Sequence, residues 1–265
     1  GDVYKRQDCD VAVVCIGEPS SLATEGTGVA KLELPEKQLR LLQALKAVGK
    51  AVVAGLFNGR PLILNEVVKN CDALLEAWYP GTMGGKAVFS LLTGEKSPSG
   101  KLTQSFPVHA GQIPVRYNPR RTFTMVNYQD IAAKPHFPFG YGLSYTHYTY
   151  SAPRSDKKNY AKGDTVTVTL KVTNKGDREG KETVQLYVHD KVSTVIPREK
   201  ELKGFCQVVL APGETKEVCF RLPSSTFECF NNKMEKVLEP GSFVIYTGES
   251  SEKVQSTEIS FDLIK

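Results

Sequence analysis

The chain has 265 residues, of which 40% are hydrophobic and 24% are charged, and its formal net charge is +5. This length fits one large domain or two ordinary domains, and this composition excludes a disordered chain. No apolar run approaches the roughly 20 residues that a membrane-spanning helix requires, so no membrane span is predicted. Basic and acidic residues are interspersed, as in residues 198–203, which argues against the clustered basic face of a nucleic-acid-binding protein.

Residues 10–94 alternate short apolar strands with amphipathic helices, which is typical of a parallel sheet flanked by helices. Three β/α units are predicted, with strands at Val11–Ile16, Ala51–Phe57 and Asp72–Trp78 and helices at 35–48, 60–67 and 82–92. A doubly wound sheet usually has about five or six strands. We therefore expect earlier strands, or even a whole preceding domain, to lie upstream of this sequence. The polar residues GDVYKRQ at the start show no signal-peptide pattern, and we expect them to be an assembly scar or the cut end of a longer chain.

Residues 118–150 are predicted to form an ordered connector. Six prolines between Lys96 and Ser151 interrupt regular structure, while ten aromatic residues in the same stretch argue against a flexible linker. From Ser151 onward, apolar and polar residues alternate, and turns such as Ala211–Gly213 separate about seven short strands. The predicted fold is therefore multidomain, α/β plus all-β. A partial parallel α/β sandwich over 8–117 is followed, after the connector, by an immunoglobulin-like or fibronectin-like β-sandwich over 151–265.

The six cysteines show neither C-x-x-C spacing nor a nearby histidine, so no zinc or other metal site is predicted. Most of them lie in apolar segments, which favours small buried hydrophobic residues over a disulfide framework. Cys206 and Cys219 are candidates for adjacent strands, although the sequence does not show that they pair. The glycines near the strand ends form neither a dinucleotide fingerprint nor a Walker motif, so no nucleotide cofactor is predicted.

Two glutamates follow the first predicted strand. Glu18 comes directly after it, and Glu25 lies deeper in the loop, between Thr24 and Gly26. Ligands of open α/β sheets collect beyond the carboxyl ends of the strands. A protonated loop carboxyl can deliver a proton to a leaving oxygen, so either residue is a candidate general acid. The alternative is a pair of solvated loop glutamates.

No G-x-S-x-G setting surrounds a serine, and the histidine spacing identifies no base, so a serine triad is not expected. Trp78 and Tyr79 follow the third predicted strand and are candidates for a sugar-stacking platform. The more usual role of aromatic residues at a strand end is packing.

Six short segments occur in a characteristic order: AWYPGTMGG at 77–85, PSGKLTQSFP at 98–107, FPFGYGLSYTHY at 137–148, KELKGF at 200–205, LAPGE at 210–214 and EPGSFVIYTG at 239–248. Together they resemble glycoside hydrolase family 3, and they are most similar to the periplasmic β-glucosidases. The resemblance extends over nearly the whole chain from Asp10. It implies a periplasmic or secreted protein that acts on an oligosaccharide or glycoside.

The resemblance implies three domains: an N-terminal (β/α)₈ barrel that carries the nucleophilic aspartate, an (α/β)₆ sandwich domain that supplies the acid/base glutamate, and a fibronectin type III-like domain. This sequence contains no barrel, so the missing barrel domain is the expected partner. The family's GE dipeptide matches Gly17–Glu18, and its proton donor matches Glu25, with Glu18 as the alternative. Members often follow the donor with a Ser-Arg pair and an Asp, where this chain has Gly28, Val29 and Lys31. The departure affects the expected substrate preference and the way in which Glu25 is held.

The implied function is that of a fragment of a retaining, exo-acting β-glycosidase, similar to β-glucosidases, that hydrolyses terminal β-linked sugars and supplies only the acid/base. A β-xylosidase of the same family is one alternative. The other is a non-catalytic carbohydrate-binding or adhesion module. A retaining mechanism needs a second carboxylate about 5–5.5 Å from the first, so the isolated fragment is expected to be inactive.

Overall fold

The computed structural model describes residues 9–26, 28–120 and 128–262. The first seven residues and positions 121–127 of the predicted connector therefore lie outside the described part of the chain. The structure divides into two compact units. Unit 1 comprises Gly1–Lys96, Ser105–Val115 and Ala132–Phe137, and unit 2 comprises Ser97–Gln104, Arg116–Ile131 and Pro138–Lys265. The residues between Lys96 and Ser151 are thus shared between the two units.

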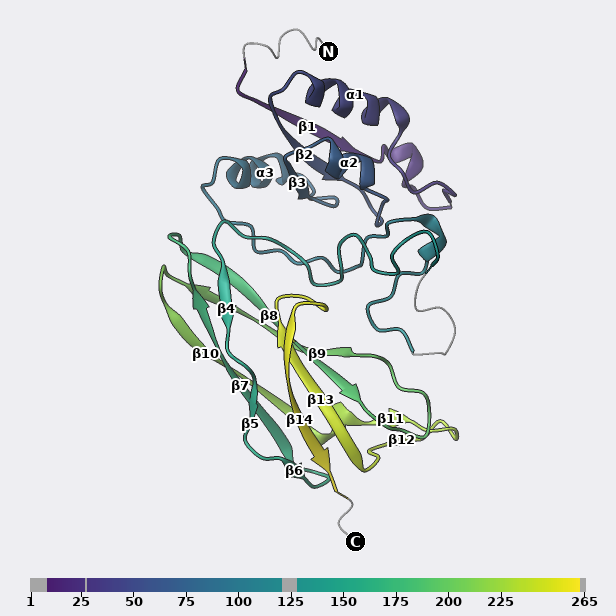
Figure 1. The fold of residues 1–265 in the computed structure, drawn as a ribbon, viewed down its shortest axis with the longest axis vertical. Coiled ribbons are helices and arrows are strands. Elements are labelled where there is room, and N and C mark those ends of the chain that lie inside the picture. The colour runs from purple at the N-terminus through teal and green to yellow at the C-terminus, as the bar shows by residue number, and fades with distance from the viewer. Residues whose placement is uncertain (1–8, 27, 121–127, 263–265) are drawn as a thin grey trace. The chain divides into compact units, whose positions relative to one another are not determined.

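Unit 1 is built on a parallel sheet of three strands, which run in the order β1 (Val11–Gly17), β2 (Ala51–Phe57) and β3 (Ala73–Glu76) (Figure 1). The predicted parallel α/β arrangement is confirmed. β3 is shorter than predicted because the chain turns at Trp78, whose φ of 50° is left-handed and cannot continue a strand.

Within the described residues, three helices accompany this sheet: α1 (Glu36–Ala47), α2 (Asn65–Lys69) and α3 (Gly84–Leu92). α1 agrees with the prediction, and it buries Leu42 and Leu45 as it packs along β1 and β2 (Figure 1). The predicted helix at 60–67 is wrong in its first half. The Ile63 amide donates to the carbonyl of Leu32 at 2.9 Å, and residues 62–64 are buried in an irregular segment. Burial of three consecutive apolar side chains overrides the helical spacing here, and the helix begins only at Asn65.

β1 lies at one edge of this sheet, and among the described residues it is buried on one face only. Val14 and Ile16 lie in the core, whereas Val11 and Val13 are 48% and 55% exposed. The continuous apolar run predicts a strand that is buried on both faces, and the described residues cover only one of them. Side chains alternate between the two faces of a strand, so Cys15 shares the uncovered face and is also exposed.

Gly17 ends β1 in a geometry that only glycine fits. Its φ is 153°, and a Cβ at this position would lie 1.8 Å from the carbonyl oxygen of Phe57. Gln38 holds the same residue from the helix side, because its side chain accepts from the Gly17 N–H and donates to the Gly17 carbonyl, both at 2.9 Å. The start of the loop that carries Glu18 and Glu25 is therefore set by close backbone packing.

We expect Gly17→Ala to lower the free energy of unfolding by about 2–4 kcal/mol, because the methyl group would push β1 and β2 apart and the backbone would be strained. Urea denaturation monitored by circular dichroism measures the change. Gly85→Ala is the matched control, since Gly85 lies in α3 with open space around its Cβ position and alanine favours a helix. Equal stabilities of the two variants would contradict this account.

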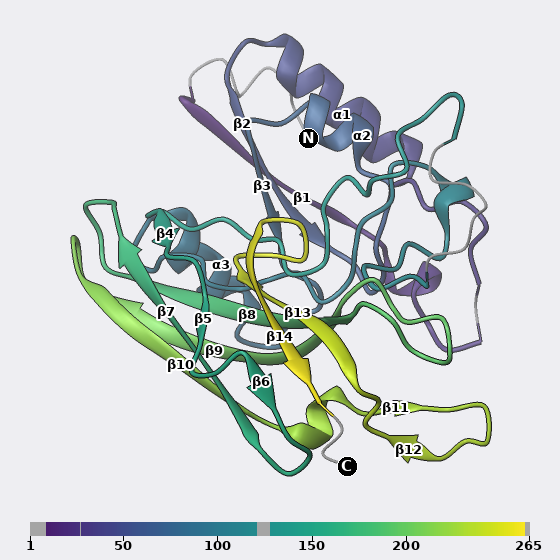
Figure 2. The same ribbon diagram turned by 60° about the horizontal axis from the view of Figure 1, so that its bottom comes forward.

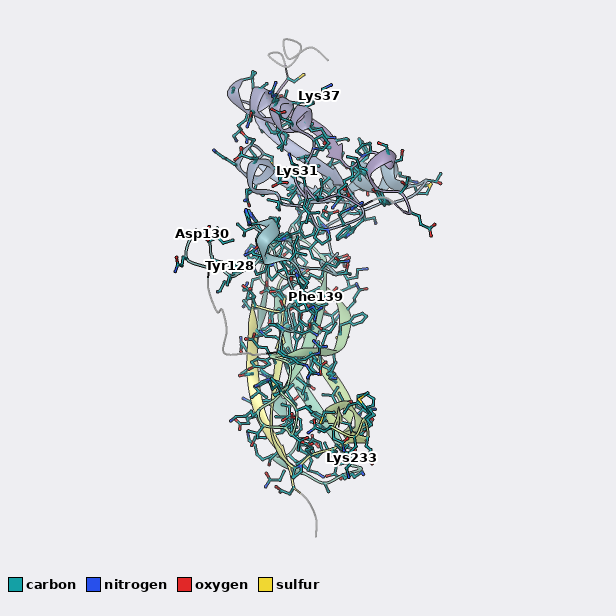
Figure 3. All side chains as sticks on the ribbon, turned by 90° about the vertical axis from the view of Figure 1, so that its right-hand side faces the viewer. Lys31, Lys37, Tyr128, Asp130, Phe139 and Lys233 are labelled. Carbon is teal, nitrogen blue, oxygen red and sulfur yellow. The ribbon has the colours of Figure 1, made fainter. Side chains whose placement is uncertain are left out.

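Unit 2 is a β-sandwich of two main sheets. One has the order β10-β7-β4, with β5 beside β7, and the other has the order β6-β14-β13-β8-β9 (Figure 2). The strands are β4 (Tyr148–Tyr150), β5 (Arg154–Ser155), β6 (Asn159–Tyr160), β7 (Thr165–Asn174), β8 (Gly180–Asp190), β9 (Glu201–Leu210), β10 (Thr215–Pro223), β13 (Gly241–Gly248) and β14 (Val254–Phe261). A small hairpin, β11 (Cys229–Phe230) and β12 (Lys236–Val237), projects beside them and carries Lys233 at its turn (Figure 3). The predicted all-β sandwich is confirmed.

The alternation along β7 matches its burial, because Val166, Val168, Leu170 and Val172 are all in the core. One of the short strands predicted after Ser151, at Thr226–Phe230, is wrong over most of its length, because the short 3-10 helix η4 (Ser224–Phe227) precedes the two-residue β11. The Phe227 ring packs 5.0 Å from Phe261 and 5.3 Å from Phe243. The turn at this point buries the Phe227 ring against the core.

No disulfide joins the six cysteines, all of which lie in the described residues. Cys206 lies on β9 and Cys219 on β10, and these strands belong to different sheets. The predicted burial of the cysteines is wrong, because three are exposed and three are intermediate. Cys15 and Cys219 each lie between two buried apolar residues on a strand and point to the opposite face, so an apolar context did not imply burial of the thiol.

Residues on both sides of positions 121–127 pack within unit 2. The Tyr117 and Phe139 rings stack with centroids 4.1 Å apart, and Tyr187 on β8 meets the Tyr117 ring edge-on at 5.9 Å. The Gln185 amide donates to the Gly140 carbonyl at 3.0 Å. These contacts hold Tyr117, Phe139 and Gly140 against β8.

Candidate active site

The polar side chains of unit 1 gather at the carboxyl ends of its strands. Glu18 follows β1, Asn58 and Arg60 follow β2, and Glu76 is the last residue of β3. The strand register pairs Gly17 with Phe57 and Leu56 with Glu76, which brings these ends to one edge. This is the edge where ligands of open α/β sheets bind.

Glu18 is tied into the fold. Its side chain is only 5% exposed, and its Oε1 lies 3.1 Å from Nε of Arg60. Its Oε2 accepts a longer hydrogen bond from the Gly59 N–H at 3.4 Å. Both oxygens are therefore engaged in joining the end of β1 to the loop after β2, and Glu18 presents little surface to a substrate.

Glu25 lies in a different setting. The 3-10 turn η2 (Ser20–Leu22) leads into its loop, and Gly26 after it has a left-handed φ of 76°. The side chain is exposed, and no hydrogen bond or ion pair from another described residue holds its carboxylate. Glu25 is not part of the Glu18–Arg60 ion pair. The two predicted residues therefore differ: Glu18 is buried and held by Arg60, whereas the carboxylate of Glu25 is exposed.

A hollow of about 750 Å³ lies beside Glu18. The loop that follows Glu25 forms much of its wall, including Val29 and Lys31, two of the positions at which the chain departs from the pattern described above. The lining also includes Glu33, Glu36 and several apolar residues, and Glu25 is not among the lining residues. Val29 and Lys31 are therefore placed where they can influence what enters the hollow.

Glu76 is a site residue that sequence reasoning missed. Burial raises the pKa of its carboxyl from 4.5 to about 7, although hydrogen bonds from the Trp78 N–H and the Asn58 side chain oppose the shift. The Trp78 N–H donates to Oε1 at 2.8 Å, while Oε2 is buried and has no partner among the described residues. The available signal was a single charged residue within the apolar run ALLEAW.

Asn58 and Arg60 were also missed. Asn58 is fully buried, and its amide donates to the Arg60 carbonyl at 2.8 Å. Arg60 in turn donates through Nη2 to the carbonyl of Leu22 at 2.8 Å. Their place immediately after a predicted strand was the signal, since Glu18 was identified by the same criterion.

The two candidate aromatic residues differ. The Trp78 ring is partly buried and packs 5.7 Å from the ring of Phe106. Tyr79 is 54% exposed, and its ring lies over Gly59, where a Cβ would come within 2.8 Å of it. Packing is thus the role of Trp78, while Tyr79 leaves an aromatic face open at the same edge as Glu18.

We expect Glu76→Gln to raise the free energy of unfolding above that of the unchanged chain, by about 1–3 kcal/mol at pH 8 and by much less at pH 4. Burial raises the pKa of Glu76, so between pH 4.5 and about 7 the folded state keeps a proton that the unfolded state loses. The stability contributed by this group is therefore lost as pH rises through that window. Urea denaturation of both proteins across this range is the measurement, and a difference that does not change with pH would contradict the prediction.

In the described part of the chain, no group of three or more histidine, cysteine, aspartate or glutamate side chains is arranged to hold a metal ion. None of the described helices is long and apolar enough to cross a membrane.

Comparison with known proteins identifies both parts of the chain. The model of the glycosyl hydrolase family 3 C-terminal domain matches residues 2–145, and that of a fibronectin type III-like domain matches residues 182–251. A crystal structure of β-glucosidase from Listeria innocua in complex with isofagomine superposes with a TM-score of 0.94 at 39% identity, covering 98% of this chain and 38% of that one.

Two curated relatives have similar coverage. A β-xylosidase from Formosa agariphila is 41% identical over 94% of this chain, and a periplasmic β-glucosidase from Salmonella typhimurium is 38% identical over 99%. In each case the match covers 35% of the relative. The chain therefore spans about a third of the length of the curated relatives that it matches.

Proposed function

Because the chain belongs to glycoside hydrolase family 3, we propose that it forms the acid/base part of a retaining, exo-acting β-glycosidase of the β-glucosidase type. Its substrates would be glycosides or oligosaccharides with a terminal β-linked sugar. The observation that carries the proposal is the exposed carboxylate of Glu25, which has no partner among the described residues, in the loop after β1. The name of the periplasmic relative supports a location in the periplasm or outside the cell.

Glu25 is favoured over Glu18 as the acid/base because of access. A general acid must come within hydrogen-bond distance of the leaving oxygen. Glu18 is 5% exposed and pairs with Arg60, so reaching a substrate would require it to break that pair. Glu25 can approach a substrate without breaking any contact of this kind.

In the proposed mechanism, a carboxylate from outside this chain attacks the anomeric carbon while Glu25 gives its proton to the glycosidic oxygen. Glu25 then takes a proton from the water that hydrolyses the glycosyl-enzyme intermediate. The two carboxyl groups of a retaining enzyme stand about 5–5.5 Å apart. We assign the nucleophile to an upstream (β/α)₈ barrel domain, in agreement with the share of its relatives that this chain spans.

A β-xylosidase is the second candidate, because one relative at 41% identity bears that name. The two activities differ in the sugar that is released. Val29 and Lys31 line the hollow beside Glu18 and are the positions in this chain most open to such a difference.

The test compares the chain alone with a longer protein that includes the upstream domain, using aryl β-glucosides and aryl β-xylosides as substrates. We expect no turnover by the chain alone and clear turnover by the longer protein. Turnover by the chain alone that disappears on Glu25→Gln would overturn the assignment of the nucleophile to another domain. Oligosaccharide binding by the chain, with no hydrolysis by the longer protein, would favour a binding module instead.

A further inference from the structure

We propose that Arg60 is a positioning residue that fixes the turn leading to Glu25, and that Asn58 holds Arg60 in place. The inference rests on the proposed function, because it gives Glu25 the acid/base role. It adds two residues that follow the neighbouring strand, β2, to the machinery of that reaction.

The guanidinium of Arg60 joins two segments at once. Its Nε lies 3.1 Å from Oε1 of Glu18, at the end of β1, and its Nη2 donates to the carbonyl of Leu22 at 2.8 Å. Leu22 is the last residue of η2 and stands three positions before Glu25. Arg60 therefore attaches the turn that precedes Glu25 to the edge of the sheet.

The hydrogen bonds of the turn itself are local. The Leu22 N–H donates to the carbonyl of Pro19 at 2.9 Å, and the Ala23 N–H donates to the carbonyl of Ser20 at 3.3 Å. Bonds of this kind close the turn but do not attach it to the sheet. The Arg60 contact spans the two strand ends and supplies an attachment to β2.

Asn58 holds the backbone of Arg60. The fully buried Asn58 side chain donates to the Arg60 carbonyl at 2.8 Å. Pro61 restricts the backbone of Arg60 to extended conformations. The backbone of Arg60 is thus fixed at the end of β2 before its side chain reaches the turn.

The charge of Arg60 is compensated by Glu18, with which it forms an ion pair. No cation pairs with Glu76 among the described residues, and the groups that face its carboxyl are the Asn58 side chain and the Trp78 N–H.

The geometry of the Arg60 side chain explains why an arginine is needed here. A planar guanidinium offers donors in fixed, diverging directions, whereas a lysine ammonium is a single point charge. Arginine can therefore meet Glu18 and Leu22 together, and lysine can meet only one of them well.

The first test uses this chain and needs no activity. In hydrogen exchange, Arg60→Met should speed exchange of the amides at 20–26 by at least about tenfold while those of β2 stay unchanged, as expected for a local opening. Arg60→Lys should give an intermediate effect. The control is Arg40→Met, which removes an exposed pair with Glu36 on α1 and should leave residues 20–26 unchanged.

Removing Arg60 alone leaves the buried Glu18 carboxylate without its cationic partner. The double variant Glu18→Gln/Arg60→Met is therefore measured as well. Faster exchange at 20–26 in the double variant supports the inference, because no unpaired charge remains to account for it. Exchange at 20–26 that is unchanged in the double variant overturns the inference, whatever happens to activity.

The second test uses the longer protein that contains the nucleophile. Arg60→Met should reduce kcat/KM for substrates with poor leaving groups more than for activated ones, and Arg60→Lys should recover part of the loss. A purely structural role would lower both classes equally, and that result with unchanged exchange overturns the inference. Faster exchange with an equal loss for both classes would support the role of Arg60 in holding the turn and overturn the role of Glu25 as the acid.

Discussion

Glu25→Gln in a protein that also contains the upstream domain should lower hydrolysis of substrates with poor leaving groups by roughly 10²–10⁴-fold, the usual contribution of a general acid. The glutamine cannot donate the proton that the departing oxygen needs. Activated aryl glycosides depart with little protonation, so their first step should be affected much less. Steady-state kinetics with a series of aryl glycosides of increasing leaving-group pKa is the measurement.

Glu18→Gln is the matched control for this experiment. Glu18 is paired with Arg60 and lies deep in the fold, so its substitution should loosen the loop without steepening the dependence on the leaving group to the same extent. A steeper dependence in Glu18→Gln than in Glu25→Gln would reverse the assignment of the two residues. Equal losses for all substrates in Glu25→Gln would exclude it as the proton donor.

Lys101→Met should lower the free energy of unfolding of the chain by about 3–5 kcal/mol, as expected when one partner of a buried ion pair is removed. Nζ of Lys101 lies 3.1 Å from Oε1 of Glu182, and the two side chains are 11% and 3% exposed. Burial raises the pKa of Glu182, while Lys101 and the Tyr150 hydroxyl, which donates to it at 2.7 Å, oppose that shift. Without Lys101 the carboxylate would be left buried and uncompensated.

Urea denaturation at pH 7 measures this loss, and Lys191→Met is the control. Lys191 pairs with Glu258 at 2.9 Å, but both side chains are about half exposed, and a surface pair of this kind contributes about 0–1 kcal/mol. The double variant Lys101→Met/Glu182→Gln should regain part of the lost stability, since the lone charge is gone. Similar losses for the buried and exposed pairs would contradict the interpretation.

The layout of both units was predictable because burial imposes a local period on the sequence. Alternating residues such as Val166 and Val168 identified the sandwich, and helical spacing identified α1. The errors have a common cause. Residues 62–64 and Phe227 take irregular backbone because distant segments bury their side chains, and no local pattern carries that information. The exposure of one face of β1 could not be predicted for the same reason, because an apolar run does not reveal which face of the strand is covered.

For the site, the sequence by itself determined that two carboxylates follow the first strand, because a polar loop after an apolar run marks the carboxyl edge of a sheet. It also carried the resemblance to the family, which the comparisons confirm. Only the tertiary structure decided how these carboxylates differ. Arg60, from the neighbouring strand end, locks Glu18 and leaves Glu25 open. Glu76 and Asn58 entered the site in the same way, because parallel pairing brings to one edge residues that lie far apart along the chain.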